Sequence, residues 1–225
     1  MIDPLRPSEY TALLIQALRL DTSHVAGARV LEIGSGSGVV LAALGALGAG
    51  SLCGVDVEPE AILSGTDLLQ SLGYAETAEL HHGDMWQPVA GRRFDLIVAN
   101  LPHFPTLASG FTGRLPSWSN GGPDGRAQLD RFINGLPEHL SPGGRALITH
   151  NAFVGLERSR EVAADKGLSL RVVTTTMLHL PDEKARRMTE SVLRAEDARS
   201  IHRYGRHIFA EMHIVEFAAA GGACA

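Results

Sequence analysis

Residues 31–40 read LEIGSGSGVV, an apolar run that ends in three closely spaced glycines and leads into a second apolar run. Glycine allows a tight turn and a close approach of a ligand to the backbone, and the N-terminus of a helix that follows offers free N–H donors. The G-x-G-x-x-G fingerprint of dinucleotide-binding proteins would need its third glycine at Val39. The turn therefore predicts a ligand site between a first strand and a first helix, and it disfavours an NAD enzyme.

Strand-like apolar runs alternate with helical patterns on both sides of this turn. Strands are expected at residues 28–34, 51–57, 78–84, 93–100, 145–151, 168–178 and 206–218. Helices are expected at residues 8–20, 37–50, 59–73, 126–140 and 153–167. This alternation predicts an α/β fold with a doubly wound, mostly parallel, seven-stranded sheet. We expect a helical segment at 1–28 that packs on the core, one α/β domain at 29–218, and a flexible tail at 219–225.

The composition fits a single globular domain of a cytoplasmic protein. A length of 225 residues does not force two domains, and no apolar run approaches the roughly 20 residues that span a bilayer. The first ten residues hold no apolar segment of the kind found in signal peptides. The two cysteines, Cys53 and Cys224, make a disulfide framework improbable. A net charge of −5 disfavours a broad, non-specific grip on nucleic acid, and no membrane partner is expected.

Two other features carry local expectations. The chain has ten histidines, including the adjacent pair His81-His82, but no pattern of cysteines or carboxylates completes a tetrahedral set. We therefore expect no metal site. Residues 182–206 hold seven basic and five acidic side chains. Mixed signs at this density are typical of a solvated helix with i,i+4 ion pairs, and the role of this segment is left open.

Three acids lie at the ends of three successive expected strands, namely Glu32, Asp56 and Asp84. The carboxyl ends of strands form the edge at which open α/β sheets bind ligands. With Glu32 before it, the Gly-x-Gly-x-Gly turn resembles the first motif of class I S-adenosylmethionine-dependent methyltransferases. The resemblance implies a Rossmann-like fold whose last strand is antiparallel. It also implies S-adenosylmethionine as cofactor, with the methionine moiety surrounded by Glu32, Gly34, Ser35, Gly36 and Gly38. Asp56 would bind the ribose, Val57 would lie against the adenine, Asp84 and Met85 would hold the adenine edge, and Asn100 would lie beside the cofactor.

The fourth strand runs into Asn-Leu-Pro-His, residues 100–103. This resembles the Asn-Pro-Pro-Tyr/Phe motif of amino-group methyltransferases, which include the HemK/PrmC enzymes that methylate a glutamine side chain. Two further segments resemble that group. Residues 5–18, LRPSEYTALLIQAL, are similar to its Pro-Arg-Pro-Glu-Thr-Glu segment, and residues 121–133, GGPDGRAQLDRFI, are similar to its Gly-Gly-x-Asp-Gly-Leu stretch. Together the resemblances frame residues 5–150.

The motif implies how an amide nitrogen could be methylated. A planar amide is a poor nucleophile because its nitrogen lone pair is delocalised. The side-chain oxygen of Asn100 and the carbonyl of Leu101 would each accept one N–H, which orients the NH₂ group towards the methyl donor. His103 or Phe104 would stack on the acceptor, and Pro102 and Trp118 would line its pocket. The resemblance thus makes Asn100, Leu101 and His103 the catalytic residues.

Departures from the motif keep several acceptors open. Leu101 replaces the first proline, His103 replaces Tyr or Phe, and the fifth strand ends in LITHN instead of Leu-Glu-Ile-Gly. A histidine can also accept a proton near neutral pH, so an O-methyltransferase with His103 as base is an alternative. The acceptor is a protein glutamine or an amide- or amine-bearing small molecule under the loop at 101–125. A nucleic-acid exocyclic amine and a non-catalytic cofactor-binding module stay as alternatives, and the oligomeric state is open.

Overall fold

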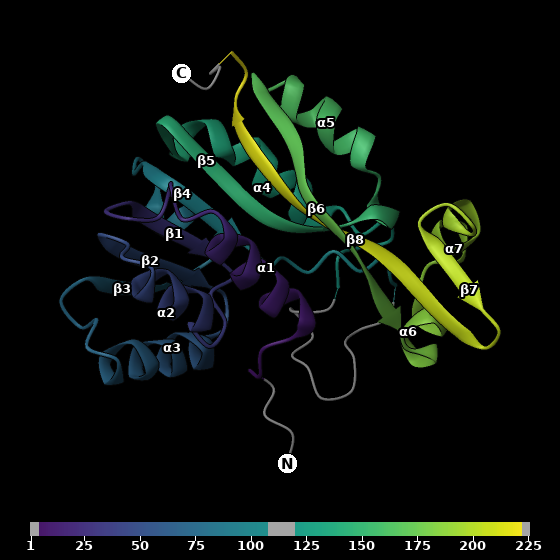
Figure 1. Ribbon diagram of the computed structural model, residues 1–225, viewed down its shortest axis with the longest axis horizontal. Coiled ribbons are helices and arrows are strands. Elements are labelled where there is room, and N and C mark those ends of the chain that lie inside the picture. The colour runs from purple at the N-terminus through teal and green to yellow at the C-terminus, as the bar shows by residue number, and fades with distance from the viewer. Residues whose placement is uncertain (1–4, 108–119, 222–225) are drawn as a thin grey trace.

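A central sheet with helices on both faces forms the core of the computed structural model, which describes residues 5–107 and 120–221 (Figure 1). The strands run in the order β3-β2-β1-β4-β5-β8-β6, with β7 paired to β8. Their bounds are β1 (Arg29–Ile33), β2 (Ser51–Asp56), β3 (Ala78–His82), β4 (Phe94–Ala99), β5 (Leu140–Asn151), β6 (Leu168–Leu180), β7 (Ile201–Tyr204) and β8 (His207–Ala219). The expected α/β, doubly wound class is confirmed.

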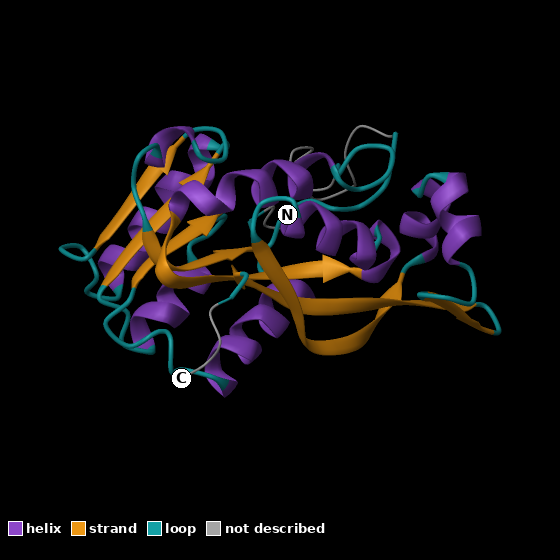
Figure 2. Cartoon of the chain, turned by 90° about the horizontal axis from the view of Figure 1, so that it is seen from above, coloured by secondary structure: helices purple, strands orange, loops and turns teal. Residues whose placement is uncertain are grey.

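Helices cover the sheet in two layers (Figures 1 and 2). Their bounds are α1 (Glu9–Leu20), α2 (Val39–Ala46), α3 (Pro59–Ser71), α4 (Ala127–His139), α5 (Leu156–Ala164), α6 (Asp182–Arg187) and α7 (Glu190–Glu196). Helices α1, α2 and α3 lie on one face, and α4 and α5 on the other. Among the described residues, no helix is long and apolar enough to cross a membrane.

The parallel half of the sheet brings three strand ends to one edge. In the register of β1 with its neighbours, Ile33 pairs with Val55 of β2 and with Ala99 of β4. These strands are buried almost throughout, as expected for parallel strands that are covered on both faces. The ends of β1, β2 and β4 therefore lie side by side, where the glycine turn follows β1, Asp56 ends β2 and Asn100 follows β4.

The antiparallel half differs from the prediction in one respect. Strand β8 lies between β5 and β6 and is antiparallel to both, as expected for the last strand. An additional strand, β7, forms a hairpin with β8. It falls inside 182–206, where a single solvated helix was expected.

The prediction of a single helix at 182–206 is wrong, because the segment is divided between the two short helices α6 and α7 and the strand β7. The backbone turns at Met188, which is extended and buried, and the N–H of Thr189 donates to the carbonyl of Pro105 at 2.9 Å. The i,i+4 pairing itself is present, for example between Arg187 and Glu183 at 3.1 Å.

The helix α1 is capped at its N-terminal end and packs into the core along its length. Ser8 accepts a hydrogen bond from the backbone of Thr11, and the Thr11 side chain accepts one from the backbone of Ser8, which together form a capping box. Further along, Leu14 and Leu18 are buried in a cluster with residues of α2 and β8. The boundaries proposed at 28/29 and 218/219 stay predictions. The end of the predicted tail, residues 222–225, lies outside the described residues.

Candidate active site

The carboxyl ends of β1, β2 and β4 open into a cavity of about 480 Å³. Most of the residues predicted for the site line it: Glu32, Gly34, Ser35, Gly36, Asp56, Val57, Asp84, Met85, Asn100, Leu101, Pro102, His103 and Phe104. Gly38 lies on the turn behind the cavity wall. The predicted substrate residue Trp118, with the middle of the 101–125 loop, lies outside the described residues.

The glycine turn has a shape that only glycine fits well. Gly36 and Gly38 have φ angles of +52° and +77°, a region that other residues enter at a cost. A side chain on Gly38 would also place its Cβ 3.0 Å from the Cα of Gly65 in α3. The turn is thus packed directly against α3, and its backbone faces the cavity.

Asp56 joins the turn to the end of β2. Its carboxylate accepts hydrogen bonds from the N–H of Gly36 at 2.8 Å and of Glu58 at 3.0 Å. Burial raises the pKa of Asp56, and the backbone hydrogen bonds oppose that shift. The side chain therefore braces the glycine turn and also contributes oxygen atoms to the cavity wall.

Glu32 and Ser35 have polar atoms without a partner among the described residues. Glu32 is 2% exposed, and its Oε2 and the Oγ of Ser35 are buried with no hydrogen bond. Desolvation raises the pKa of Glu32 well above its usual range, and the nearby charge of Asp56 raises it further. Buried polar atoms normally have partners, so these two atoms fit a ligand with polar groups in the cavity.

Asp84 and Met85 occupy the far wall. The carboxylate of Asp84 is half-exposed and forms an ion pair with Arg131 of α4 at 2.7 Å. Met85 is buried and has a φ of +53°, an uncommon value for a residue other than glycine. No local sequence pattern indicates that Arg131 pairs with Asp84.

Asn100 is held from two sides at the end of β4. Its Oδ1 accepts a hydrogen bond from Thr149 Oγ1 of β5 at 2.8 Å. Its Nδ2 donates to Thr11 Oγ1 of α1 at 3.4 Å. The carboxamide is therefore oriented before any ligand binds, with the carbonyl of Leu101 next to it in the chain.

His103 lies in the cavity wall as a neutral ring. It is 4% exposed, and its Nδ1 has no hydrogen-bond partner among the described residues. Burial, and then the charge of Lys184, lower the pKa of His103 to about 4. This environment disfavours a charged imidazole, because the ring would lose its hydration there, and the alternative role of His103 as a base stays a prediction.

Aromatic contacts fix the rings around His103. Tyr10 of α1 meets His103 edge-on, with ring centroids 5.9 Å apart, and Phe104 meets Phe153 edge-on at 6.1 Å. The hydroxyl of Tyr10 donates to Asn151 Oδ1 at 3.2 Å. Burial raises the pKa of Tyr10 to about 12, so that it stays protonated.

Sequence reasoning missed the contributions of α1, β5 and α6 to the cavity. Tyr10 and Thr11 of α1, Asn151 of β5 and the residues around Lys184 all line it. One signal was present: Thr149-His150-Asn151 ends an apolar strand with three polar residues, as Asn100 ends β4. Polar residues at the end of a buried strand pointed to Asn100, and the same pattern points to this triplet.

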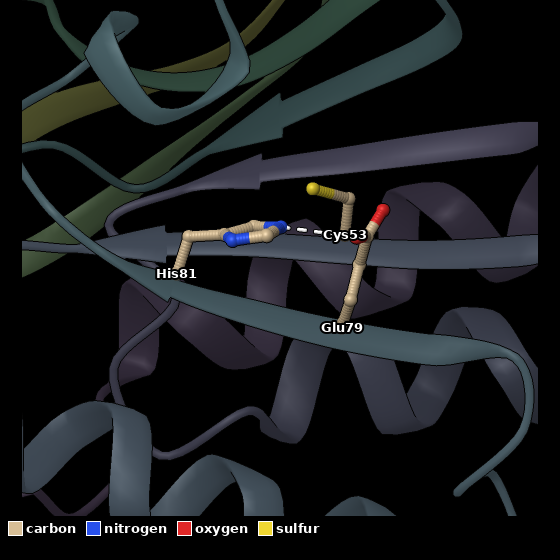
Figure 3. Close-up of side chains that lie close together, drawn as sticks. All are labelled: Cys53, Glu79 and His81. Carbon is tan, nitrogen blue, oxygen red and sulfur yellow. Dashed lines mark hydrogen bonds and ion pairs between the residues drawn. The ribbon is translucent and has the colours of Figure 1, made fainter.

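A second cluster lies on β2 and β3, where Cys53, Glu79 and His81 point towards one another (Figure 3). Their ligand atoms lie within 4.8 Å of each other. Glu79, however, is already bound by the guanidinium of Arg92 and by His81. Burial raises the pKa of the Cys53 thiol to about 12. A protonated thiol beside an arginine does not favour a metal ion, and the prediction of no metal site stays a prediction.

Known proteins that are similar to this chain are named as methyltransferases. Residues 30–112 match the family model of a methyltransferase domain. The chain is 31% identical over 189 residues to a Methanocaldococcus jannaschii protein named "Putative protein N5-glutamine methyltransferase", covering 79% of this chain and 86% of that protein. It is 33% identical over 158 residues to human methyltransferase HEMK2, covering 63% of this chain and 69% of that one.

The chain belongs to the HemK/PrmC-like, S-adenosylmethionine-dependent methyltransferases. The methyltransferase is also 30% identical over 151 residues to a release factor glutamine methyltransferase of Geobacter sulfurreducens, of which it spans 52%. Solved structures show the same fold. One is the E. cuniculi Mtq2–Trm112 complex, with a TM-score of 0.60, 15% identity, and coverage of 95% of this chain and 97% of that one.

Proposed function

We propose that this methyltransferase transfers a methyl group to the side-chain nitrogen of a glutamine in a protein. The observation that carries the proposal is Asn100, whose carboxamide is fixed at the cavity wall by Thr149 and Thr11. Relatives named N5-glutamine methyltransferase and release factor glutamine methyltransferase support the choice of acceptor.

The cofactor is expected along the carboxyl ends of β1, β2 and β3. S-adenosylmethionine supplies an electrophilic methyl group when it is bound. Glu32 and Ser35 would meet the polar groups of its methionine moiety, because their buried oxygen atoms lack partners among the described residues. Asp56 would accept hydrogen bonds from the ribose hydroxyls, and the wall of Val57, Asp84 and Met85 would receive the adenine.

The acceptor amide would lie at Asn100. An amide oxygen has two lone pairs, and Thr149 uses one of those on Asn100 Oδ1. The other can accept one N–H of the glutamine, while the carbonyl of Leu101 accepts the second. This arrangement orients the nitrogen towards the methyl group, and orientation lowers the barrier without a strong base. The new N–CH₃ bond would form as the methyl–sulfur bond of the donor breaks, with S-adenosylhomocysteine as the leaving group, and the amide would release one N–H proton to solvent.

The state of His103 weighs against a hydroxyl acceptor. A general base is most effective when its pKa lies near the working pH, and the pKa of His103 is about 4. An amide acceptor needs no such base, so His103 would serve as a ring in the wall of the acceptor pocket. Its contact with Tyr10 keeps that ring in place.

The test is transfer of a tritiated methyl group to a panel of acceptors. The panel contains a purified release factor, a glutamine-containing peptide, small primary amides and a short nucleic acid. The release factor should be labelled, and conversion of its glutamine to glutamate should abolish labelling. Labelling of the nucleic acid alone would contradict the proposal.

Three variants then separate nitrogen from oxygen chemistry on the same acceptor. Asn100→Ala should lower kcat and kcat/KM together by about 10²–10³-fold, as expected when a contact made in the transition state is lost. Asn100→Asp should retain more activity, because it keeps an oxygen for the N–H. His103→Phe should stay active. An inactive His103→Phe with an active Asn100→Ala would refute the nitrogen mechanism, and calorimetry with S-adenosylhomocysteine controls for cofactor binding.

A further inference from the structure

The end of β5 places three consecutive polar side chains in the protein interior. Thr149, His150 and Asn151 are each at most 2% exposed. A buried polar group is costly unless it is hydrogen-bonded, and each of the three has a partner. Thr149 donates to Asn100, His150 bonds the hydroxyl of Ser159 at 2.8 Å, and Asn151 accepts from Tyr10.

Thr149 is the member of this triplet that bonds Asn100. Its neighbour Ile148 pairs with Ala99 of β4, so Thr149 and Asn100 continue the same register beyond the end of β4. The 2.8 Å bond from Thr149 Oγ1 therefore arises from the sheet itself, one of the most rigid parts of the fold.

Thr11 completes the support from the other side. Its Oγ1 accepts a hydrogen bond from Asn100 Nδ2 at 3.4 Å and another from the backbone N–H of Ser8 at 3.2 Å. The first turn of α1 is thus linked to the carboxamide through a single hydroxyl. The amide group is held at its oxygen by β5 and at its nitrogen by α1.

We infer that Thr149 is a positioning residue that keeps Asn100 Oδ1 facing the acceptor nitrogen. The χ2 torsion of an asparagine is broad and roughly two-fold, so an unsupported carboxamide also turns its NH₂ towards the acceptor. An NH₂ group donates and cannot accept the N–H of the substrate. Thr149 removes that non-productive orientation. This inference rests on the proposed function, in which Asn100 Oδ1 accepts an N–H of the substrate.

Kinetics on the release factor test the role. Thr149→Val keeps the shape of the side chain and removes its donor, and Thr149→Ser keeps the donor. Thr149→Val should lower kcat by about 10- to 100-fold, the range in which misplacement of a reacting group acts, with KM and S-adenosylhomocysteine affinity changed by less than about threefold. Thr149→Ser should restore most of kcat. Equal activity of Thr149→Val and the wild type, or failure of Thr149→Ser to recover, would overturn the inference.

A second measurement needs no acceptor. The chain has only four asparagines, so ¹⁵N-asparagine labelling gives few side-chain NH₂ signals, and the signal missing from Asn100→Ala identifies Asn100. Its order parameter should be about 0.85, as for rigid groups, and should fall towards about 0.6 in Thr149→Val. Thr106→Val is the matched control, because Thr106 is equally buried and bonds the carbonyl of Arg187 instead.

The two measurements separate the inference from the proposed function. An unchanged Asn100 signal in Thr149→Val, or an equal loss of order in Thr106→Val, refutes the role of Thr149 for any acceptor. The order parameter of the Asn100 NH₂ group could fall only in Thr149→Val while the wild type methylates no nitrogen in the panel. In that case the contact between Thr149 and Asn100 stands and the nitrogen mechanism fails. The inference that Thr149 serves catalysis then fails with it.

Discussion

Acid should destabilise this methyltransferase because it buries neutral histidines. Burial lowers the pKa of His103 to about 4 and that of His150 to about 3, from an ordinary value of 6.5. Above pH 6.5 neither the folded nor the unfolded state binds these protons. As the pH falls below 6.5, the unfolded state takes them up first, so the free energy of unfolding decreases until the folded pKa is reached.

The size of the effect follows from the two pKa differences. One pKa unit corresponds to about 1.36 kcal/mol. Between pH 6.5 and 5.0 each of these histidines therefore lowers the free energy of unfolding by about 2 kcal/mol, and the two together lower it by about 4 kcal/mol. Glu32 and Asp56 act in the opposite direction, because their raised pKa values make the folded state bind protons more readily. A comparison of the wild type with histidine variants separates the contribution of the histidines to the pH dependence from that of the acids.

The assay is urea unfolding at pH 7.5 and pH 5.0 at constant ionic strength. His103→Phe should reduce the loss of stability between these pH values by about 2 kcal/mol relative to the wild type. His179→Phe, at an exposed position of β6, is the matched control and should keep the full loss. If His103→Phe loses as much stability as the wild type, His103 is not a buried neutral ring, and the argument against its role as a base fails with it.

Three further outcomes are expected. Asp56→Ala should weaken the binding of S-adenosylmethionine and S-adenosylhomocysteine by at least about tenfold in calorimetry, since at least one hydrogen bond to a charged group is lost. An unchanged affinity would contradict the cofactor assignment. Deletion of residues 107–119 should abolish turnover but leave the cofactor affinity within a few-fold of the wild type. Loss of both would show that the loop supports the fold and does not serve the acceptor alone. Arg126→Met should lower the free energy of unfolding by about 3 kcal/mol, because buried Arg126 bonds Asp130, Ser159 and two backbone carbonyls. A decrease below about 1 kcal/mol in urea unfolding would refute this expectation.

The sequence was informative wherever the site lies directly after a strand. The glycine turn follows β1, Asp56 ends β2 and Asn100 follows β4, and parallel pairing alone brings those strand ends together. Local patterns cannot give contacts between distant segments. Thr11 meets Asn100 across 89 positions, and Tyr10 meets Asn151 across 141. Such pairs depend on where α1 packs, which its own amphipathic pattern does not specify.

The single helix expected at 182–206 failed for a similar reason. Its charges alternate as in a solvated helix, but Met188 is buried and the Thr189 backbone bonds Pro105. Tertiary packing thus overrode a pattern that was correct only for the exposed charges. The environment of His103 was equally hidden, because a pKa depends on burial by segments that are remote in the sequence.

The place of β8 in the sheet has a consequence for synthesis on the ribosome. Strand β5 lacks its second neighbour until residues 207–219 have left the exit tunnel, because β8 alone separates β5 from β6. Until then the nascent chain presents an unpaired, apolar strand edge of the kind that recruits other chains. Cotranslational chaperones would meet this edge from the emergence of residues 140–151 until residues 207–219 follow, and slow codons before residue 207 would prolong that exposure.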